Sequence, residues 1–398
     1  MFAMLRGVDH PFSISATRAA VAAYGGRMKT LTCFRIVAPA LLLAGCASSI
    51  RTGAPMPSPS SPDPAVAAFA RDLDSLRVAH RIPGLSVAVV RDGRVVLARG
   101  FGMADVEGAV PATENTPYNI ASVSKTISGV VALRLAERGV IDLDRPMTSY
   151  AGWAEFCAEM RDEGPRVFFA DYRCDAELTL RHLMSMEANG GAGVRFLYNP
   201  ISYSWASRPL MEVTGKTFSD LVVEEVFAPA GMARSARINR RLPLRADLAA
   251  ELAQPYHDSA GAFVRSPPPP PQGDGAAGGV ISTVADLAKF DLALDDGKLL
   301  TEARKAEMWR PGRSPSGAVL PYGIGWFTQR VDGRRAVWHS GLWDGAYSAL
   351  YLKLPDERLT MILLANSEGL RWGNPLDDAR VETSPFAAAF LRRFPPRR

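Results

Sequence analysis

One pair of residues in this chain has the types and spacing for nucleophilic chemistry. Ser122 and Lys125 stand three apart, and no other serine among the 398 residues has a lysine at that spacing. The apolar residues that follow repeat at helical spacing: Ile127, Val130, Val131 and Leu135. This pattern predicts an amphipathic helix that begins near Ser122 and stops at Gly139. Side chains three apart on a helix meet, so we expect the Lys125 amine to reach the Ser122 hydroxyl.

The chemistry expected of such a pair is acyl transfer. A serine hydroxyl attacks a carbonyl efficiently only when a neighbouring base takes its proton. Lysine is such a base only if burial or a nearby cation lowers its pKa. The unpaired N–H groups of a helix start favour negative charge that develops beside them. A Ser-x-x-Lys tetrapeptide also occurs by chance, so other features of the chain must decide.

Composition argues against a nucleic-acid-binding protein. The formal net charge is +5, but residues 1–45 hold five basic residues and one acidic residue. The rest of the chain is therefore nearly neutral and lacks the basic surface that phosphate binding requires. A hydrophobic fraction of 47% over 398 residues is enough for a substantial core.

Residues 1–45 are predicted to be a targeting segment. Lys29 and Arg35 precede an apolar run, residues 36–45, that is too short to span a bilayer and ends in small residues. We therefore expect the protein to be exported. An ordinary secretory signal and a lipoprotein signal both fit this pattern.

The end of that run favours the lipoprotein signal. Residues 43–46, Leu-Ala-Gly-Cys, resemble the lipobox of bacterial lipoproteins, which implies cleavage before Cys46 and acylation of that cysteine. Met28 is then the expected start, and the proline- and serine-rich residues 46–64 are the expected tether. The protein is accordingly expected on the periplasmic side of the outer membrane, since Ala47 is not the aspartate associated in some bacteria with inner-membrane retention.

Export changes what the remaining cysteines imply. Cys33 would be lost with the signal segment, which leaves Cys157 and Cys174 in an oxidising compartment. A disulfide between them is therefore a hypothesis of the sequence. Closing a loop of that size would stabilise the fold by about 3 kcal/mol.

The expected fold is α+β, with an antiparallel sheet made from both ends of the chain. Strand-like runs lie at 85–91, 94–100, 336–340, 346–354 and 359–366. Asp92-Gly93 joins the first two and is a strong hairpin signal. Because two strands are not stable alone, the C-terminal runs are expected to complete the sheet. Helices flank it, a mainly helical region of about 126–310 is inserted, and residues 65–398 form one domain.

Five stretches together resemble the serine β-lactamase and penicillin-binding-protein superfamily, in the class C β-lactamase-like branch that includes esterases and D-aminopeptidases. They follow the family's order: 82–84, 119–125, 178–183, 196–232, and 338–341 with 363–366. The resemblance implies the β-lactamase/transpeptidase fold. It also implies that Ser122 is the acylated nucleophile and Lys125 its proton partner.

The family's second element, Tyr-x-Asn, is matched by Tyr198-Asn199-Pro200. The resemblance implies that Tyr198 shuttles protons beside Lys125. Proline in place of the family's asparagine removes an amide that would brace Lys125 and contact the acyl amide of a substrate. Tight recognition of β-lactams or peptides is therefore in doubt, and Asn199 is a candidate to compensate from one position away.

The third element, usually Lys-Thr-Gly, is matched by His339-Ser340-Gly341. The resemblance implies that these residues bind substrate on a strand, where the glycine lets the substrate backbone approach. The N–H of Leu342 would then pair with that of Ser122 to hold the oxyanion of a tetrahedral intermediate. A histidine need not be charged near neutral pH, so it is a weaker clamp for a substrate carboxylate than lysine. This departure argues against an efficient β-lactamase.

These features predict an exported serine hydrolase that acts through an acyl-enzyme on ester or amide substrates, without cofactor or metal. One alternative is a β-lactamase or D,D-peptidase. Another is a non-catalytic penicillin-recognising sensor of the same fold, suggested by Pro200 and by residues 185–189, where relatives often carry Thr-Ser-Gly. The expected partners are a small ester, peptide or β-lactam-like substrate and a membrane, reached through Cys46. Residues 153–175 and 267–271 are expected to shape the pocket.

Overall fold

The computed structural model describes residues 63–174, 177–271, 273–373 and 378–396. The predictions for the signal segment, the acylated Cys46 and most of the tether lie outside the described residues and stay predictions. Within the described part of the chain, no helix is both long and apolar enough to cross a membrane.

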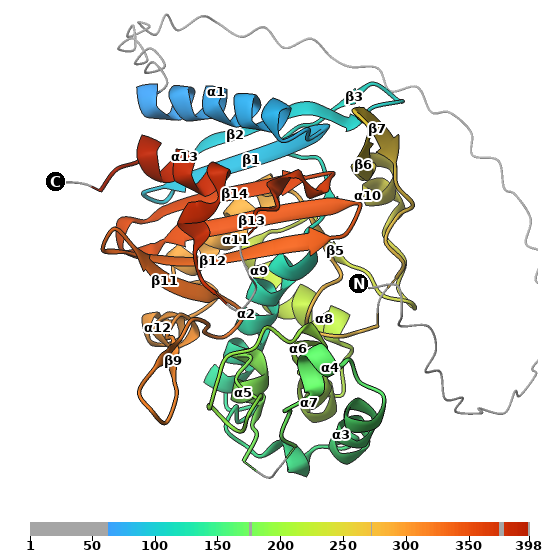
Figure 1. The fold of residues 1–398 in the computed structure, drawn as a ribbon, viewed down its shortest axis with the longest axis vertical. Coiled ribbons are helices and arrows are strands. Elements are labelled where there is room, and N and C mark those ends of the chain that lie inside the picture. Colours follow the sequence, from blue (N-terminus) through green and yellow to red (C-terminus); the bar gives the residue numbers. More distant parts are fainter. Residues whose placement is uncertain (1–62, 175–176, 272, 374–377, 397–398) are drawn as a thin grey trace, which may run out of the picture. The chain divides into compact units, whose positions relative to one another are not determined.

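Seven strands form one sheet in the order β11-β12-β13-β14-β1-β2-β3, and every neighbouring pair is antiparallel (Figure 1). The bounds are β1 Gly84–Arg91, β2 Arg94–Asp105, β3 Val110–Pro111, β11 Phe327–Val331, β12 Arg334–Trp343, β13 Tyr347–Leu354 and β14 Leu359–Ala365. β1 pairs with β14, so that Leu85 lies opposite Ala365. The expectation of an antiparallel sheet made from both chain ends is confirmed.

The turn between β1 and β2 explains why the first hairpin forms. Asp92 and Gly93 have φ angles of 52° and 73°, both in the left-handed region. A two-residue hairpin loop of this kind matches the twist of the strands it joins, and Asp-Gly adopts it at low cost.

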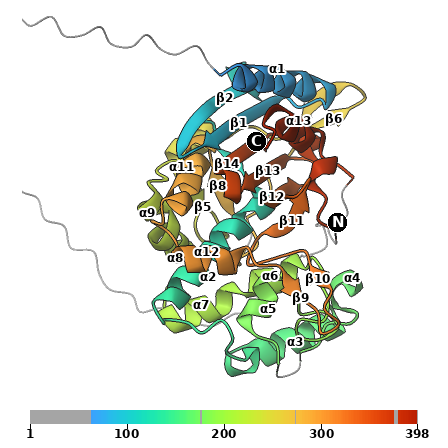
Figure 2. The ribbon, with the colours of Figure 1, turned by 90° about the vertical axis from the view of Figure 1, so that its left-hand side faces the viewer.

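Helices cover both faces of the sheet (Figure 2). On one face lie α1 (Pro64–Ala79) and α13 (Pro385–Arg393), where the rings of Phe69 and Phe390 are 5.5 Å apart. On the other face lies α11 (Val284–Asp295), which contacts β1, β2 and β14. β1 is consequently buried on both faces, which explains its nearly continuous apolar sequence.

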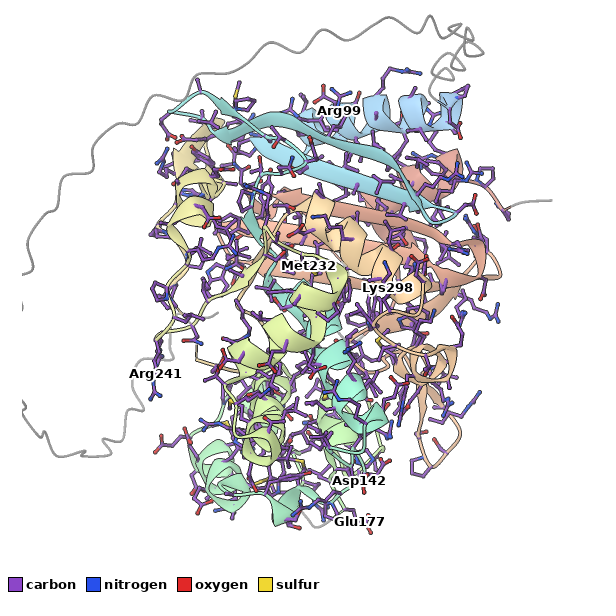
Figure 3. All side chains as sticks on the ribbon, turned by 180° about the vertical axis from the view of Figure 1, so that it is seen from behind. Arg99, Asp142, Glu177, Met232, Arg241 and Lys298 are labelled. Atoms are coloured by element: carbon purple, nitrogen blue, oxygen red, sulfur yellow. A yellow bond between two sulfur atoms is a disulfide. The ribbon has the colours of Figure 1, made fainter. Side chains whose placement is uncertain are left out.

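The inserted region is mainly helical and lies beside the sheet (Figures 1 and 3). Its helices are α3 Trp153–Asp162, α4 Arg166–Phe169, α5 Leu180–Met184, α6 Pro200–Trp205, α7 Ser207–Thr214, α8 Phe218–Val222, α9 Ala228–Ala230, α10 Ala246–Glu251 and α12 Glu302–Met308. Short strands accompany them: β4 Tyr118–Asn119, β5 Ala236–Arg237, β6 Tyr256–Ser259, β7 Ala262–Arg265, β8 Val280–Ser282, β9 Gly312–Arg313 and β10 Val319–Leu320. Figure 3 shows Asp142 and Glu177 at the end of this region far from the sheet.

The helix after Ser122 differs from the sequence prediction. α2 spans Ser124–Glu137, so the predicted helix is present and begins two residues after Ser122. It is buried at every residue from Ser124 to Leu133 and not only along the predicted apolar stripe. The physical reason is that α8, α12 and the π-helical turn Val223–Phe227 all pack against α2. The small residues Ser128 and Gly129 lie on faces that the apolar stripe did not include, and they too are buried.

The inserted region also contains a disulfide between Cys157 in α3 and Cys174, with Cα atoms 6.0 Å apart. The segment that it closes is attached to α6 through the Tyr172 and Ser202 hydroxyls, 2.7 Å apart. The disulfide thus anchors a segment that lies beside the residues following Tyr198.

Candidate active site

Ser122 lies in a 3-10 turn, Ala121–Val123, between β4 and α2. It therefore precedes the helix by two residues. Ala121 has a φ of 46°, a left-handed conformation that costs a residue with a Cβ about 1–2 kcal/mol. The Asn119 side chain holds this turn by accepting a hydrogen bond from the Ala121 N–H at 2.9 Å. Strain of this kind concentrates at functional positions, and no residue pattern in the sequence predicts it.

Lys125 is completely buried and aims its amine at Ser122. Its Nζ donates to Ser122 Oγ at 2.9 Å and to the carbonyl oxygen of Ala277 at 3.0 Å. Burial lowers the pKa of this amine to about 7. An amine with that pKa is partly neutral at physiological pH and is able to accept a proton.

Tyr198 lies on the other side of the same amine. Lys125 Nζ is 5.2 Å from the centre of the Tyr198 ring and 5.6 Å from that of Tyr203. Burial raises the pKa of the Tyr198 phenol above its ordinary value, although a hydrogen bond with Ser122 partly opposes this. The phenol therefore stays protonated near neutral pH, where it is able to donate and relay a proton but is not a strong base.

His339 lies in β12 and is buried, with its ring centre 6.0 Å from that of Tyr198. Burial, together with the nearby Lys125 amine, lowers its pKa to about 3, so the ring is neutral. Nδ1 lies 2.6 Å from the Ser340 carbonyl oxygen and must donate to it, which leaves Nε2 to accept from the Tyr322 hydroxyl at 2.8 Å. Both ring nitrogens are thus already hydrogen bonded within the protein.

The strand that carries His339 has an open edge beside Ser122. β11 pairs with β12 only as far as Trp338, whereas β12 continues to Trp343 with β13 on its other side. Gly341 allows the turn of Ser122 to lie against this strand, because a Cβ there would come within 2.3 Å of the Ile120 carbonyl oxygen. The pairing of the Ser122 and Leu342 N–H groups as an oxyanion hole stays a prediction.

Asn199 does not replace the amide that Pro200 removes. Its Oδ1 accepts from the N–H groups of Ile201 and Ser202 and caps α6, while its Nδ2 donates to the Phe168 carbonyl at 3.3 Å. The side chain is almost fully buried and holds the helix start in place. The hypothesis that it compensates for Pro200 is therefore wrong.

Several residues near the amine were missed by the sequence analysis. Tyr203 donates from its hydroxyl to the Lys125 carbonyl at 2.9 Å, and Gly325, with φ of 80°, leaves room for both. Tyr322 supports His339, and the Ala277 carbonyl accepts from the amine. No sequence pattern pointed to Tyr203, because its partner lies 78 residues away in the chain. None pointed to the Ala277 carbonyl either, since a backbone atom of any residue type would serve.

Two cavities among the described residues lie away from Ser122. One, of about 320 Å³, borders the disulfide and is lined by residues such as Phe169 and Tyr172. The other, of about 360 Å³, lies between α5 and α12 and is lined by Arg181, Glu187 and Arg310 among others. The expectation that residues 153–175 shape the substrate pocket is not tested by either cavity, because neither is lined by Ser122, Lys125 or Tyr198.

Glu187 borders the second cavity, and ionisation of its buried carboxyl destabilises the folded protein. Its side chain is buried, and Oε1 has no hydrogen-bond partner among the described residues. Burial raises the pKa of this carboxyl from 4.5 to about 7, although Arg181 partly opposes the shift. Between those two values the unfolded chain is ionised while the folded protein keeps the proton, so this group makes the protein less stable as pH rises.

We expect Glu187→Gln to remove that loss. The free energy of unfolding is measured with urea at about pH 5 and about pH 8. Between these two pH values it should fall by about 2–3 kcal/mol more in wild type than in the variant. Glu163→Gln, at an exposed glutamate of the same region, is the control and should keep the wild-type dependence. Equal pH dependence in Glu187→Gln and wild type would show that this carboxyl titrates normally.

The chain is similar to known proteins over most of its length. The beta-lactamase family model matches residues 66–382. Penicillin-binding protein 4* of Bacillus subtilis (strain 168) is 26% identical over 323 residues, which are 74% of this chain and 70% of that protein. Protein flp of Staphylococcus aureus (strain MW2) is 24% identical over 307 residues, 72% of this chain and 60% of that protein. The chain therefore spans less than two thirds of the length of the Staphylococcus relative.

Solved structures share the fold. The octameric penicillin-binding protein homologue from Pyrococcus abyssi superposes with a TM-score of 0.62 at 22% identity, over 82% of this chain and 77% of that chain. D-amino acid amidase from Ochrobactrum anthropi SV3 superposes with a TM-score of 0.58 at 21% identity, over 75% and 91% of the two chains. With the family model matching most of its length, the chain belongs to the beta-lactamase family, within the superfamily of serine β-lactamases and penicillin-binding proteins.

Proposed function

We propose that the protein is a serine hydrolase that cleaves neutral ester or amide substrates through an acyl-enzyme on Ser122. The observation that carries the proposal is the 2.9 Å contact between Ser122 Oγ and the buried amine of Lys125, whose pKa is about 7. A buried amine of this kind supplies the base that a serine nucleophile needs near neutral pH.

The reaction has two halves. In the first, Lys125 takes the Ser122 proton as Oγ attacks the substrate carbonyl, and the resulting oxyanion rests on the N–H groups of Ser122 and Leu342. The proton then passes, with Tyr198 as relay, to the departing alcohol or amine as the carbon–heteroatom bond breaks. In the second half, water gives a proton to Lys125 and attacks the ester, and Ser122 recovers its proton as the acid departs.

The surroundings of the pair favour a neutral substrate over a β-lactam. The acid group of a penicillin calls for a cation, but the His339 ring is neutral and both of its nitrogens are occupied. Pro200 offers no amide to an acylamino side chain, and Asn199 is committed to α6. A β-lactamase or D,D-peptidase remains the second candidate, supported by the 26% identity to a penicillin-binding protein.

The two candidates are separated by mixing the purified protein with a short-chain aryl ester and, separately, with benzylpenicillin while following its intact mass. The hydrolase proposal predicts continued ester turnover and little penicillin adduct, with an ester rate at least about 100-fold above the penicillin rate. Fast penicillin turnover would support the β-lactamase. A long-lived stoichiometric penicillin adduct without ester turnover would support the D,D-peptidase or the sensor.

A further inference from the structure

The amine of Lys125 depends on one backbone atom outside its own helix. Besides donating to Ser122 Oγ, it donates to the carbonyl oxygen of Ala277, at 3.0 Å. Ala277 lies in the segment 273–279, which forms no helix or strand and follows the proline run 267–271. An irregular segment keeps a carbonyl in place only if other contacts fix it. The question is which contacts do so here.

Asp274 accepts the hydrogen bonds that hold the start of this segment in place. Its Oδ2 accepts from the Phe218 N–H at 2.9 Å, and its Oδ1 accepts from the Ser219 hydroxyl at 3.0 Å. Oδ1 also accepts from the guanidinium of Arg237 and, at 3.3 Å, from the amide of Asn239. The backbone carbonyl of Asp274 accepts from Ser207 Oγ at 2.9 Å.

Arg237 is the buried partner that links Asp274 to the next residues. Its side chain is 1% exposed, and it donates through Nη1 to Asp274 and through Nη2 to the Gly275 carbonyl. The ring of Phe218 lies 5.0 Å from its guanidinium carbon. Since Arg237 lies in β5, opposite Val280 of β8, the same strand pairing holds both ends of the segment.

Ala276 connects the segment to α6 and to α2, the helix that carries Lys125. The Ala276 N–H donates to the Ser204 carbonyl at 3.0 Å, and the Ala276 carbonyl accepts from Ser128 Oγ at 2.6 Å. Gly275 has no room for a side chain, because a Cβ there would meet Ser204 Oγ at 1.8 Å. The segment is thus fixed from α6, α7, α8, β5 and α2, with Asp274 three residues from the carbonyl that accepts from Lys125.

We propose that the Asp274–Arg237 ion pair is a positioning device for Lys125. It holds the Ala277 carbonyl at the place where that oxygen accepts a hydrogen bond from Nζ, and so keeps the amine aimed at Ser122. The ion pair touches neither substrate nor Ser122 and acts only through the segment 274–277. This inference rests on the proposed role of Lys125 as the base for Ser122.

A positioning role predicts a specific kinetic pattern. Without the Ala277 carbonyl in place, a smaller fraction of enzyme molecules has the amine aligned for proton transfer, so kcat falls while substrate binding changes little. A carbonyl acceptor also favours the charged ammonium over the neutral amine. Its loss therefore lowers the pKa of Lys125 and moves the acid limb of the kcat profile to lower pH.

The test compares Asp274→Asn with a matched break elsewhere on α2. Glu225 is buried and accepts from Arg134 of α2 at 3.1 Å and from Arg138, the residue that follows α2, at 2.8 Å. Glu225→Gln therefore breaks a similar ion pair without touching the segment 274–277. That pair lies by Lys298, whose carbonyl also accepts from Arg134 and which Figure 3 labels. Steady-state hydrolysis of an aryl ester is measured against pH for both variants and wild type.

For Asp274→Asn we expect kcat to fall about 10- to 100-fold, KM to stay within about threefold, and the acid limb to move to lower pH, while Glu225→Gln keeps the wild-type profile.

Wild-type kcat and profile in Asp274→Asn, or the same change in Glu225→Gln, would overturn the inference. Should Asp274→Asn not fold, Ser207→Ala is measured instead; it removes the bond to the Asp274 carbonyl and a longer one, at 3.2 Å, to the Ser204 carbonyl. It should show a smaller change in the same direction, and an unchanged profile there would equally overturn the inference. Ser122→Ala is run in parallel: if it retains turnover, the proposed function fails, whereas an inactive Ser122→Ala beside an unchanged Asp274→Asn overturns the inference alone.

Discussion

Replacing Ser122 with alanine should abolish ester turnover and leave the fold intact. The hydroxyl is the proposed site of acylation, and an alanine offers no atom that forms the ester. We expect the loss to reach about 10³- to 10⁶-fold in kcat, the scale on which removing the nucleophile of a serine hydrolase acts. The side chain hydrogen bonds with Lys125 and with Tyr198, so the free energy of unfolding should change by only about 1–2 kcal/mol.

Ser124→Ala is the matched control for this experiment. Ser124 lies two residues away and is fully buried, with its hydroxyl accepting from the Val280 N–H at 3.3 Å rather than contacting Lys125 Nζ. The control should keep ester turnover within about fivefold of wild type, because it removes packing and a weak hydrogen bond only. Comparable turnover in Ser122→Ala and wild type would remove Ser122 from the mechanism.

Replacing Lys125 with methionine should lower activity by a factor similar to that of Ser122→Ala. Unlike Ser122→Ala, it should make the folded protein more stable at low pH. Methionine fills much of the same space but accepts no proton, so we expect kcat to fall by about 10³-fold or more. In wild type, kcat/KM should fall on the acid side of pH 7, where the amine becomes protonated. Lys216→Met, at an exposed lysine paired with Glu224, is the control and should leave activity unchanged.

The stability effect of Lys125→Met follows from the pKa. Burial lowers the pKa of the Lys125 amine from its ordinary value of 10.5 to about 7 in the folded protein. Between those values the unfolded chain binds the proton and the folded protein does not, so wild-type stability rises with pH across that window. Below pH 7 the Lys125 ammonium is charged and buried, which destabilises the folded wild type by the full amount. At that pH we expect the variant to be more stable than wild type by about 2–4 kcal/mol.

That advantage should shrink as the pH is raised toward about 9. Thermal or urea unfolding of the two proteins across this range measures it directly. A variant less stable than wild type at low pH would show that the ammonium is well accommodated when charged. In that case burial would not be the source of a basic amine.

The sequence was sufficient for those parts of the fold that local patterns determine. Alternation of apolar residues and the Asp92-Gly93 turn located the strands of both chain ends, and Asp92 and Gly93 indeed have positive φ angles. β11 and β3 were not predicted, because they are short edge strands whose pairing depends on their neighbours. The burial of α2 on all sides from Ser124 to Leu133 could not be deduced either, since it depends on which elements of the inserted region surround the helix.

The candidate site divides in the same way. Spacing and order selected Ser122, Lys125 and Tyr198, which the structure brings together. The left-handed Ala121, the carbonyl of Ala277 and the committed side chain of Asn199 escaped detection. Each of these depends on backbone conformation or on a partner far away in sequence, and residue type alone carries no information about either.

The most direct measurement is the location of the acyl group. The protein is mixed with a short-chain aryl ester, quenched in acid within the first turnovers and digested, and the peptide containing Ser122 is examined by mass spectrometry. We expect an added acyl mass on that peptide, mapped to Ser122, which appears before steady state and is lost as ester is consumed. Ester turnover with no acyl mass at Ser122 at any time, or with a stable acyl group on another residue, would contradict it.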